Sequence, residues 1–287
     1  MTVLVTGGTG YIGRELVKRL EDHGEQVRVL TRKPKHARDV NGDIANYTDV
    51  ENAMRGCNNV FHLAAQLGHS RPYALLHEVN VVGTENVLRA ALQLGVKRVV
   101  HASSVAAAED FDSNYNKTKK EAELVVSKYQ KKGITVPVMR IGPVYDDERL
   151  ARVKGKWFPA PDLNVQLHLV YRPSVVDGLI KAREKGTNKV YYLADEKPVS
   201  SKALYETIMK AQEKRVTYLP GFFVPLGIHS IRGLEWLFEK TGKRFLFSHK
   251  LLQAGLLHRE YDNSLAVREL DYRPVDTLAT FNQIFSS

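Results

Sequence analysis

The sequence predicts an α/β protein in which a doubly wound parallel sheet is joined to a smaller C-terminal α+β lobe. Short apolar runs of strand length alternate with helical patterns through the first half of the 287 residues. Such alternation is typical of a parallel sheet with helices on both faces. The glycine-rich segment Thr6–Gly13 directly follows the first run, where a doubly wound sheet has its first strand-to-helix turn. In the second half proline is frequent and one clear strand stands out, Val190–Leu193, which suits a smaller lobe.

The expected elements follow one another in the order that such a sheet requires. Strands are expected at Thr2–Val5, Val27–Thr31, Val60–Leu63, Arg98–His101 and Thr135–Arg140. Between them we expect a first helix with Ile12, Leu16 and Leu20 on one face, and later helices over Asn86–Leu94 and Asn116–Lys132. Residues 1–145 would form the sheet domain, with parts of 165–195 returning to it, and residues 146–287 would mainly form the smaller lobe.

The composition fits a chain that folds around a large core. Hydrophobic residues make up 43% of the chain and charged residues 26%, as is ordinary for a globular protein. The single cysteine, Cys57, excludes an intrachain disulfide framework and fits a reducing compartment. The first strand begins at residue 2, and the stretch Leu219–Ile228 is too short and too broken by proline to span a bilayer. We therefore expect a cytoplasmic protein with Cys57 as a small buried hydrophobe.

The charge balance favours basic residues. There are 42 Lys and Arg residues against 32 Asp and Glu residues, which gives a formal net charge of +10. The charges are scattered and match no motif that reads nucleic acid, so we expect no nucleic-acid partner. A basic surface that favours anionic ligands and plain solvated charge are equally good interpretations.

The glycine-rich segment contains three spaced glycines that meet different physical needs. Gly7 permits the tight turn, Gly10 lets backbone approach a pyrophosphate, and Gly13 lets the helix pack closely on the strand. The helix N-terminus then offers N–H groups and a positive dipole end to the phosphates. A lone glycine motif is a weak signal, but the strand before it and the helix after it favour a dinucleotide site in a Rossmann domain. The residues expected to contact the dinucleotide here are Gly7, Thr9, Gly10, Tyr11, Ile12 and Gly13.

The end of the second strand bears on the choice between NAD and NADP. An acidic residue there would bind the ribose hydroxyls of NAD, whereas an arginine would pair with the 2′-phosphate of NADP. The chain has Arg32 and Lys33 at this place and no carboxylate before Asp39. A guanidinium matches phosphate geometry and an ammonium adds a point charge. We therefore expect NADP, with NAD as an alternative and solvated loop residues as the competing interpretation.

Tyr115 and Lys119 form a Tyr-x-x-x-Lys pattern that places both side chains on one face of a helix. A nearby ammonium is expected to lower the pKa of the phenol, which is about 10 when unperturbed. The pair could then move a proton at a substrate oxygen while hydride passes to or from a nicotinamide. The pattern also occurs by chance in lysine-rich helices. A strand that ends at Ser103 and Ser104 favours catalysis, because a serine hydroxyl could orient the reacting oxygen.

These motifs together resemble the extended short-chain dehydrogenase/reductase family, also called the NAD-dependent epimerase/dehydratase family. Further segments match the family in its order, so the resemblance covers nearly the whole chain: Gly42–Ile44, His62–Ala65, Asn80–Asn86, Arg140–Tyr145 and Glu269–Pro274. One departure is that the segment between Ser104 and Tyr115 is much shorter than in most of the family. It lacks the usual Val-Tyr-Gly, which implies a more open pocket or one that is closed by the second lobe.

The resemblance implies a role for each matched residue. Tyr115 would be the acid/base, and Lys119 would bind the nicotinamide ribose and tune the tyrosine. Ser104, rather than Ser103, would orient the substrate. Contacts to the cofactor are implied for Asp43, at the adenine, and for Ile44, Leu63, Ala64 and Ala65. His62 and Asn80 are interpreted as strand-end packing and a helix hydrogen bond. No metal site is expected, and the resemblance suggests a homodimer packed through two long helices, including the one that bears Tyr115.

The reaction is less closely defined than the cofactor site. Arg140–Tyr145 looks like the hydroxysteroid dehydrogenase and dihydroflavonol reductase branch, whereas sugar-nucleotide epimerases tend to have Arg-Tyr-Phe-Asn there. C-terminal apolar residues could line a hydrophobic pocket, form the core of the small lobe, or rest on membrane lipid: Phe222, Phe223, Trp236, Leu237, Phe238, Phe245 and Phe247. We expect an oxidoreductase that prefers NADP and interconverts a hydroxyl and a carbonyl on an apolar or mixed small molecule. The alternatives are a sugar-nucleotide epimerase or dehydratase with tightly bound cofactor, and a non-catalytic NADP-binding sensor or assembly factor.

Overall fold

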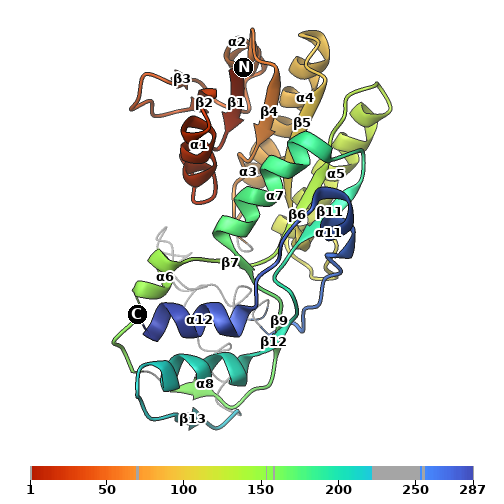
Figure 1. Ribbon diagram of the computed structural model, residues 1–287. Helices are drawn as coiled ribbons and strands as arrows, with labels where there is room; N and C mark the ends of the chain where they lie inside the picture. The colour runs from red at the N-terminus through yellow and green to blue at the C-terminus, as the bar shows by residue number, and fades with distance from the viewer. Residues whose placement is uncertain are drawn as a thin grey trace, which may run out of the picture. The chain divides into compact units, whose positions relative to one another are not determined.

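The chain divides into two compact units in a computed structural model, which describes residues 2–68, 71–152, 154–157, 159–221, 253 and 256–286 (Figure 1). The first unit consists of Met1–Gly142, Arg172–Leu193 and Asn263–Arg273. The second consists of Pro143–Tyr171, Ala194–Asp262 and Pro274–Ser287. Three separate segments of the chain therefore form the first unit.

A seven-stranded sheet with the order β11-β6-β5-β4-β1-β2-β3 forms the centre of the first unit. The strands are β1 (Thr2–Thr6), β2 (Gln26–Thr31), β3 (Asp39–Asn41), β4 (Asn59–His62), β5 (Arg98–Ser104), β6 (Val138–Ile141) and β11 (Val190–Leu193). Every neighbouring pair is parallel. The predicted doubly wound sheet is thus confirmed, and the order reverses between β1 and β4, where such sheets have a crevice at the carboxyl ends of their strands.

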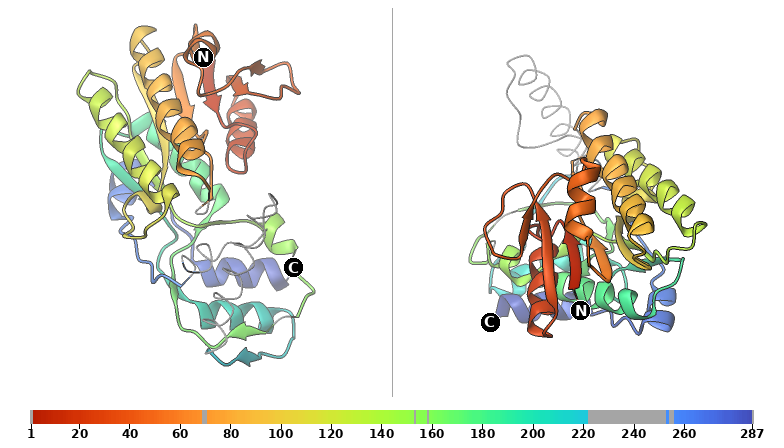
Figure 2. Two further views of the ribbon diagram at one scale, coloured as in Figure 1. Left: turned by 180° about the vertical axis from the view of Figure 1, so that it is seen from behind. Right: turned by 90° about the horizontal axis from the view of Figure 1, so that it is seen from above.

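Helices cover both faces of this sheet, as Figures 1 and 2 show. One face carries α1 (Gly13–Asp22) and α7 (Arg172–Lys185), and α11 (Ser264–Leu270) packs beside α7 and β11. The other face carries α2 (Tyr47–Met54), α4 (Gly83–Gln93) and α5 (Asn114–Gln130). Shorter turns complete the unit: α3 (Tyr73–His77), the π-helical η1 (Glu78–Val82) and the 3₁₀ turn η2 (Val105–Ala107).

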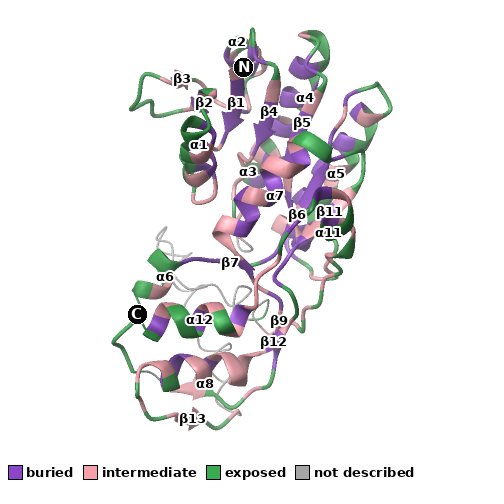
Figure 3. Cartoon of the chain, viewed as in Figure 1, coloured by how far each residue is buried: buried purple, intermediate pink, exposed green. Residues whose placement is uncertain are grey.

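Burial follows the pattern that a sheet covered on both faces requires. β1, β4 and β5 are buried along most of their length (Figure 3), with Val3, Phe61 and Val100 fully inaccessible. α1 buries Leu16 and Leu20. Cys57 is buried as a small hydrophobe, as expected, and that burial raises the pKa of its thiol.

The second unit is smaller and mixes short strand pairs with helices. The pairs are β7 (Val144–Tyr145) with β10 (Val170–Tyr171), β9 (Gln166–Leu167) with β12 (Val199–Ser200), and β8 (Ala160–Pro161) with β13 (Tyr218–Leu219). Its helices are α6 (Asp147–Ala151), α8 (Ser201–Ala211) and α12 (Thr277–Ser286). α8 and α12 pack together, and Tyr145, Tyr205 and Phe281 are buried in this core.

A buried carboxylate links the three chain segments of the second unit. Asp195 is fully inaccessible, and its Oδ2 accepts hydrogen bonds from the hydroxyls of Tyr145 (2.9 Å) and Thr277 (2.7 Å). Its Oδ1 accepts the backbone N–H of Tyr171 at 3.0 Å. Burial nevertheless raises the pKa of Asp195 to about 6, although the hydrogen bonds from Thr277 and Tyr145 act in the opposite direction.

Some sequence expectations concern residues outside the described part of the chain. The predicted apolar residues Phe222, Phe223, Trp236, Leu237, Phe238, Phe245 and Phe247 all lie there, as does most of Leu219–Ile228. Within the described part, no helix combines the length and the apolar character needed to cross a bilayer.

Candidate active site

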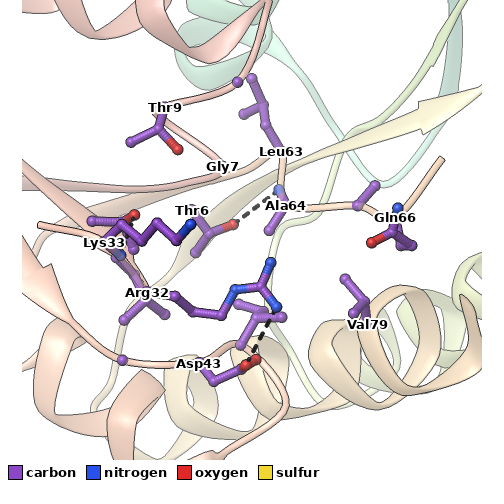
Figure 4. Close-up of a pocket in the computed structure, with 16 residues that line it drawn as sticks. Thr6, Gly7, Thr9, Arg32, Lys33, Asp43, Leu63, Ala64, Gln66 and Val79 are labelled. Carbon is purple, nitrogen blue, oxygen red and sulfur yellow. Dashed lines mark hydrogen bonds and ion pairs between the residues drawn. The ribbon is translucent and has the colours of Figure 1, made fainter. Parts of the chain in front are cut away.

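A groove with a volume of about 750 Å³ opens in the first unit near the point where the strand order reverses (Figure 4). The predicted cofactor residues that line it are Gly7, Thr9, Gly10, Arg32, Lys33, Asp43, Ile44, Leu63, Ala64 and Ala65. The predicted cofactor residues that do not line it are Tyr11, Ile12, Gly13, Tyr115 and Lys119. The structure therefore brings most of the predicted cofactor residues to one groove.

Backbone geometry explains two of the three glycines. Gly7 has φ +73°, and a Cβ added there would lie 2.6 Å from the backbone nitrogen of Ala64. A Cβ at Gly13 would lie 2.2 Å from the carbonyl oxygen of Gly7. Both positions therefore exclude any side chain, which confirms the predicted tight turn and the predicted close helix packing. A Cβ at Gly10 would meet the Gly7 oxygen at 3.1 Å and no other atom within 4 Å, so the space beside Gly10 is open.

Tyr11 does not line the groove and instead contacts the first residue of α7. The guanidinium of Arg172 lies 4.8 Å from the centroid of the Tyr11 ring. The same guanidinium donates from Nε to Glu15 Oε2 at 2.7 Å, and the two side chains are mostly buried. These contacts join the glycine turn, α1 and α7 to one another.

A buried histidine supports the wall of the groove between β1 and β4. His62 Nε2 lies 2.9 Å from the hydroxyl of Thr84, whose own proton goes to a backbone carbonyl oxygen at 2.6 Å. His62 must therefore donate from Nε2 and accept on Nδ1 from the hydroxyl of Thr6, 2.8 Å away. Burial, with the charge of Lys119 as a smaller cause, lowers the pKa of His62 to about 3. The ring is neutral, and it orients Thr6, which accepts the backbone N–H of Ala64.

Asn80 fixes the next part of the same wall. Its side chain accepts the backbone N–H of Gln66 at 2.7 Å and donates to the carbonyl oxygen of Gln66 at 3.1 Å. It also donates to the hydroxyl of Thr118 at 3.2 Å. Thr118 lies on α5 between Tyr115 and Lys119, so Asn80 ties the groove wall to the helix of the predicted catalytic residues. The side chain of Asn80 thus makes a hydrogen bond to a helix residue and links two segments of the chain.

The three predicted catalytic residues lie at the end of β5 and on the first turns of α5. The Ser104 hydroxyl lies close enough to the Tyr115 phenol to act on its pKa, so the short loop between them does not keep them apart. Lys119 is 3% exposed and donates from Nζ to the carbonyl oxygen of Ala102 at 3.0 Å. The Ser103 hydroxyl instead donates to Glu123 at 2.5 Å. Of the two serines, Ser104 is the one placed beside Tyr115.

The ionisation of Tyr115 differs from the sequence expectation. We expected the Lys119 ammonium to lower the pKa of the phenol, but the pKa of Tyr115 is raised. Burial is the main cause, and the charge of Glu109 adds to it, whereas Ser104 acts in the opposite direction. The expectation was wrong because it considered the neighbouring charge and not the loss of water around the ring. Tyr115 is therefore protonated at neutral pH and able to donate a proton.

A second cavity, of about 500 Å³, adjoins the groove behind the glycine turn and shares Thr9, Thr31 and Lys33 with it. Arg14 and Lys35, which the sequence analysis did not single out, also line it. Within the described residues, the side chains of Arg14, Lys33 and Lys35 have no hydrogen-bond or ion-pair partner. Arg32 by contrast lies 3.8 Å from Asp43, in a pair that is largely exposed. The cavity therefore offers unpaired positive charge at the end of β2.

Comparison with known proteins assigns the family. Residues 3–145 match the NAD dependent epimerase/dehydratase family. The chain belongs to this family. It is thereby a member of the extended short-chain dehydrogenases/reductases, which are NAD(P)-dependent enzymes.

Relatives in this family catalyse different reactions. A 4-hydroxy-2-methyl-3-oxo-4-farnesyl-3,4-dihydroquinoline-1-oxide ketoreductase of Stigmatella aurantiaca is 29% identical over 74% of this chain and 73% of that protein. A 3-beta-hydroxysteroid dehydrogenase of Mycolicibacterium neoaurum is 28% identical, over 96% and 87%. A UDP-glucose 4-epimerase of Vibrio cholerae is 26% identical, over 85% and 82%. A solved short-chain dehydrogenase/reductase superfamily protein from Agrobacterium tumefaciens has a TM-score of 0.77 at 18% identity, covering 100% of this chain and 96% of that one, which supports the fold.

The groove fits the cofactor of the family. Gly7 and Gly10 leave its phosphate end without side chains, and Lys33 supplies positive charge where the second cavity joins it. Ile44 provides an apolar surface at the other end, beside the carboxylate of Asp43. Sequence reasoning missed several lining residues: Thr6, Leu30, Thr31, Gly42, Gln66 and Val79. Thr6 and Thr31 could have been found as the last residues of their strands, because carboxyl ends of parallel strands meet at one edge.

Proposed function

We propose that the protein is an NADP-preferring oxidoreductase that interconverts a hydroxyl and a carbonyl on an apolar or mixed small molecule. The observation that carries this proposal is that Ser104, at the end of β5, lies close enough to the Tyr115 phenol to act on its pKa, with the Lys119 ammonium anchored one helical turn further on. Two adjacent hydroxyls can both donate to a single substrate oxygen. A ketone or aldehyde oxygen held there is polarised and oriented.

The cofactor supplies or accepts the hydride when it is bound, and the residues of the chain handle the proton. In the direction of reduction, Tyr115 donates its phenolic proton to the carbonyl oxygen as that oxygen gains negative charge. Its raised pKa suits this role, because the proton is present at neutral pH. Lys119 stabilises the negative charge left on the phenol, and it has N–H groups available for the cofactor ribose.

Unpaired cations support the preference for NADP. Arg14, Lys33 and Lys35 line a cavity that adjoins the end of β2, and a phosphate gains charge-assisted hydrogen bonds from such groups. Arg32 is held near Asp43 by an exposed pair, which is weak enough to open for a phosphate. NAD binding would favour an acidic residue next to Thr31 to hold the ribose hydroxyls, and the chain has Arg32 and Lys33 there.

The test uses the purified protein with NADPH and a panel of apolar ketones and aldehydes. We expect NADPH oxidation by the wild-type protein and a loss of about 10²- to 10⁴-fold for Tyr115→Phe. Tyr73→Phe, on a helix outside the site, is the matched control and should keep full activity. Fluorescence titration should give tighter binding of NADPH than of NADH. Far tighter binding of NADH, or unchanged turnover in Tyr115→Phe, would overturn the proposal.

A sugar-nucleotide epimerase or dehydratase is the alternative, favoured by the likeness to a UDP-glucose 4-epimerase over most of the chain. Such an enzyme regenerates its cofactor within each turnover. The cofactor would then co-purify with the protein, and a UDP-sugar would be converted without net NADPH consumption. Free exchange of NADPH during turnover distinguishes the oxidoreductase from it.

A further inference from the structure

A row of polar side chains crosses the sheet face beneath α5. Ser103 on β5 is the register partner of Arg140 on β6, and Arg140 is the partner of Tyr192 on β11. Arg140 Nη1 donates to the Tyr192 hydroxyl at 2.7 Å. Buried strands of a parallel sheet are usually apolar, so this row needs an explanation.

Glu123 on α5 is the centre of the row. Its Oε1 accepts from the Ser103 hydroxyl at 2.5 Å and from Arg140 Nε at 3.1 Å. Its Oε2 accepts from Arg140 Nη2 at 2.6 Å. The Glu123 side chain is 13% exposed and that of Arg140 is 19% exposed. A two-point pair between arginine and carboxylate, largely removed from water, has a fixed geometry.

Lys119 lies one helical turn before Glu123, on the same face of α5. The Lys119 ammonium donates to the carbonyl oxygen of Ala102, and Glu123 accepts from the side chain of the next residue, Ser103. Successive turns of α5 are therefore held by successive residues of β5. Glu123 and Lys119 therefore contact neighbouring residues of the same strand.

The charges around Lys119 show what Glu123 adds. His62 on β4 and His101 on β5 both face the ammonium, and burial lowers the pKa of each ring, so both are neutral. Burial also lowers the pKa of Lys119, to about 8, and Glu123 is the group that raises it again. Arg140 is tied to Glu123 by a two-point pair, so removal of Arg140 would leave the Glu123 carboxylate without its countercharge.

We propose that Glu123 is a positioning residue that places a negative charge one helical turn from Lys119 and holds that part of α5 on β5, with Ser103 and Arg140 fixing the Glu123 carboxylate. The proposal rests on the proposed function, in which Lys119 binds the cofactor ribose and supports Tyr115. It assigns the polar row to the site rather than to the packing of the fold.

The test measures NADPH affinity by fluorescence from about pH 7 to about pH 9. This range brackets the pKa of Lys119, which burial lowers to about 8. In the wild-type protein the affinity should fall as Lys119 loses its proton. Glu123→Gln removes the negative charge, so the fall should occur about one pH unit lower. Arg140→Gln removes a positive charge and leaves the carboxylate, so the fall should move to higher pH. Ser103→Ala keeps both charges and removes one of the three hydrogen bonds to the carboxylate, so its midpoint should move less than that of either charge variant.

The opposite shifts separate an electrostatic role from a structural one. A structural role would make Glu123→Gln and Arg140→Gln weaken binding alike, without moving the midpoint, and that result would overturn the proposal. If Glu123→Gln does not fold, Arg140→Gln alone decides, since a downward or absent shift contradicts the proposal. Lys119→Met is the reference for the proposed function. If Lys119→Met leaves the pH dependence of NADPH affinity unchanged, the result counts against the proposed function itself. If the pH dependence requires Lys119 but is the same in Glu123→Gln, the result counts against this inference alone.

Discussion

Lys119 in the first unit and Asp195 in the second are both buried ionisable side chains, and their partners differ in kind. The Lys119 ammonium has three N–H donors and, within the described residues, makes one hydrogen bond, to the Ala102 carbonyl oxygen. Asp195 accepts two hydroxyls and one backbone N–H from other segments of its unit. Lys119 therefore has N–H donors that make no hydrogen bond within the described residues, whereas both carboxylate oxygens of Asp195 accept hydrogen bonds.

The difference indicates what each charge is for. A buried charge without full compensation reduces stability, so a protein keeps one where a ligand completes its partners. The lowered pKa of Lys119 agrees with that interpretation, since its ammonium is buried with few partners. A buried carboxylate whose acceptors are filled by its own chain has no capacity left for a ligand. Asp195 is therefore assigned to the folding of the second unit.

The largest effect is expected for Lys119→Met. We expect NADPH-dependent reduction to fall by about 100-fold or more, because the ammonium that stabilises the reacting charge is gone. The free energy of unfolding should stay the same or increase, because methionine removes a buried charge that has few partners. Steady-state kinetics and urea unfolding measure the two effects.

Lys120→Met is the matched control for this substitution, since Lys120 is the next residue on α5 and is exposed. It should change neither rate nor stability. A loss of stability in Lys119→Met similar to its loss of rate would make Lys119 a structural residue and remove the contrast with Asp195.

The next largest effect is expected for Asp195→Ala. This substitution should reduce stability and leave NADPH binding unchanged, which is the reverse of Lys119→Met. The substitution leaves the hydroxyls of Tyr145 and Thr277 without their acceptor, so we expect the free energy of unfolding to fall by about 3 kcal/mol. Thr277→Val removes a single donor and should cost about 1 kcal/mol. Urea unfolding measures both values, and NADPH titration of the folded protein should show unchanged affinity. Weakened NADPH binding in Asp195→Ala would show that Asp195 is not confined to a structural role.

The pH dependence of stability provides a smaller effect from the same residue. The pKa of Asp195 is about 6 in the folded protein against an ordinary value of 3.8. Between these values the folded state binds a proton that the unfolded state has released, so the free energy of unfolding falls as the pH rises. The contribution is at most about 3 kcal/mol. Asp195→Asn should remove this part of the slope, as thermal unfolding of both proteins from about pH 4 to about pH 7 would show. An identical slope in the variant would contradict the raised pKa.

The sequence predicted the glycine turn and most of the strands because their signals are local. The φ of Gly7 and the tight packing at Gly13 follow from a turn of a few residues. The strand predicted at Thr135–Arg140 is shorter in the structure, where β6 begins at Val138, since Pro137 has no N–H to donate to the sheet. β3 was missed because Asp39–Asn41 has no apolar pattern.

What the sequence could not provide depends on the register between distant segments. Ser103 and Arg140 become neighbours through the pairing of β5 with β6, and Glu123 joins them from α5. The spacing of Tyr115 and Lys119 placed them on one helix face but carried no information on burial, so the direction of the tyrosine pKa was wrong. The second cavity likewise depends on how the chain folds between β2 and β3, which brings Lys35 towards Arg14.

The smallest effect is expected where charges are exposed rather than buried. Lys33 lines both the groove and the second cavity and has no partner within the described residues, so Lys33→Ala should weaken NADPH binding by about tenfold. Arg32 is 71% exposed and pairs with Asp43 at 3.8 Å, so its pair must open before a phosphate can bind, and Arg32→Ala should cost less than Lys33→Ala. NADH binding should change little in either variant, because NADH has no 2′-phosphate. Fluorescence titrations of both cofactors measure these ratios. Equal losses for NADH and NADPH would place the two cations outside the phosphate site and leave Arg14 and Lys35 as the cations to examine.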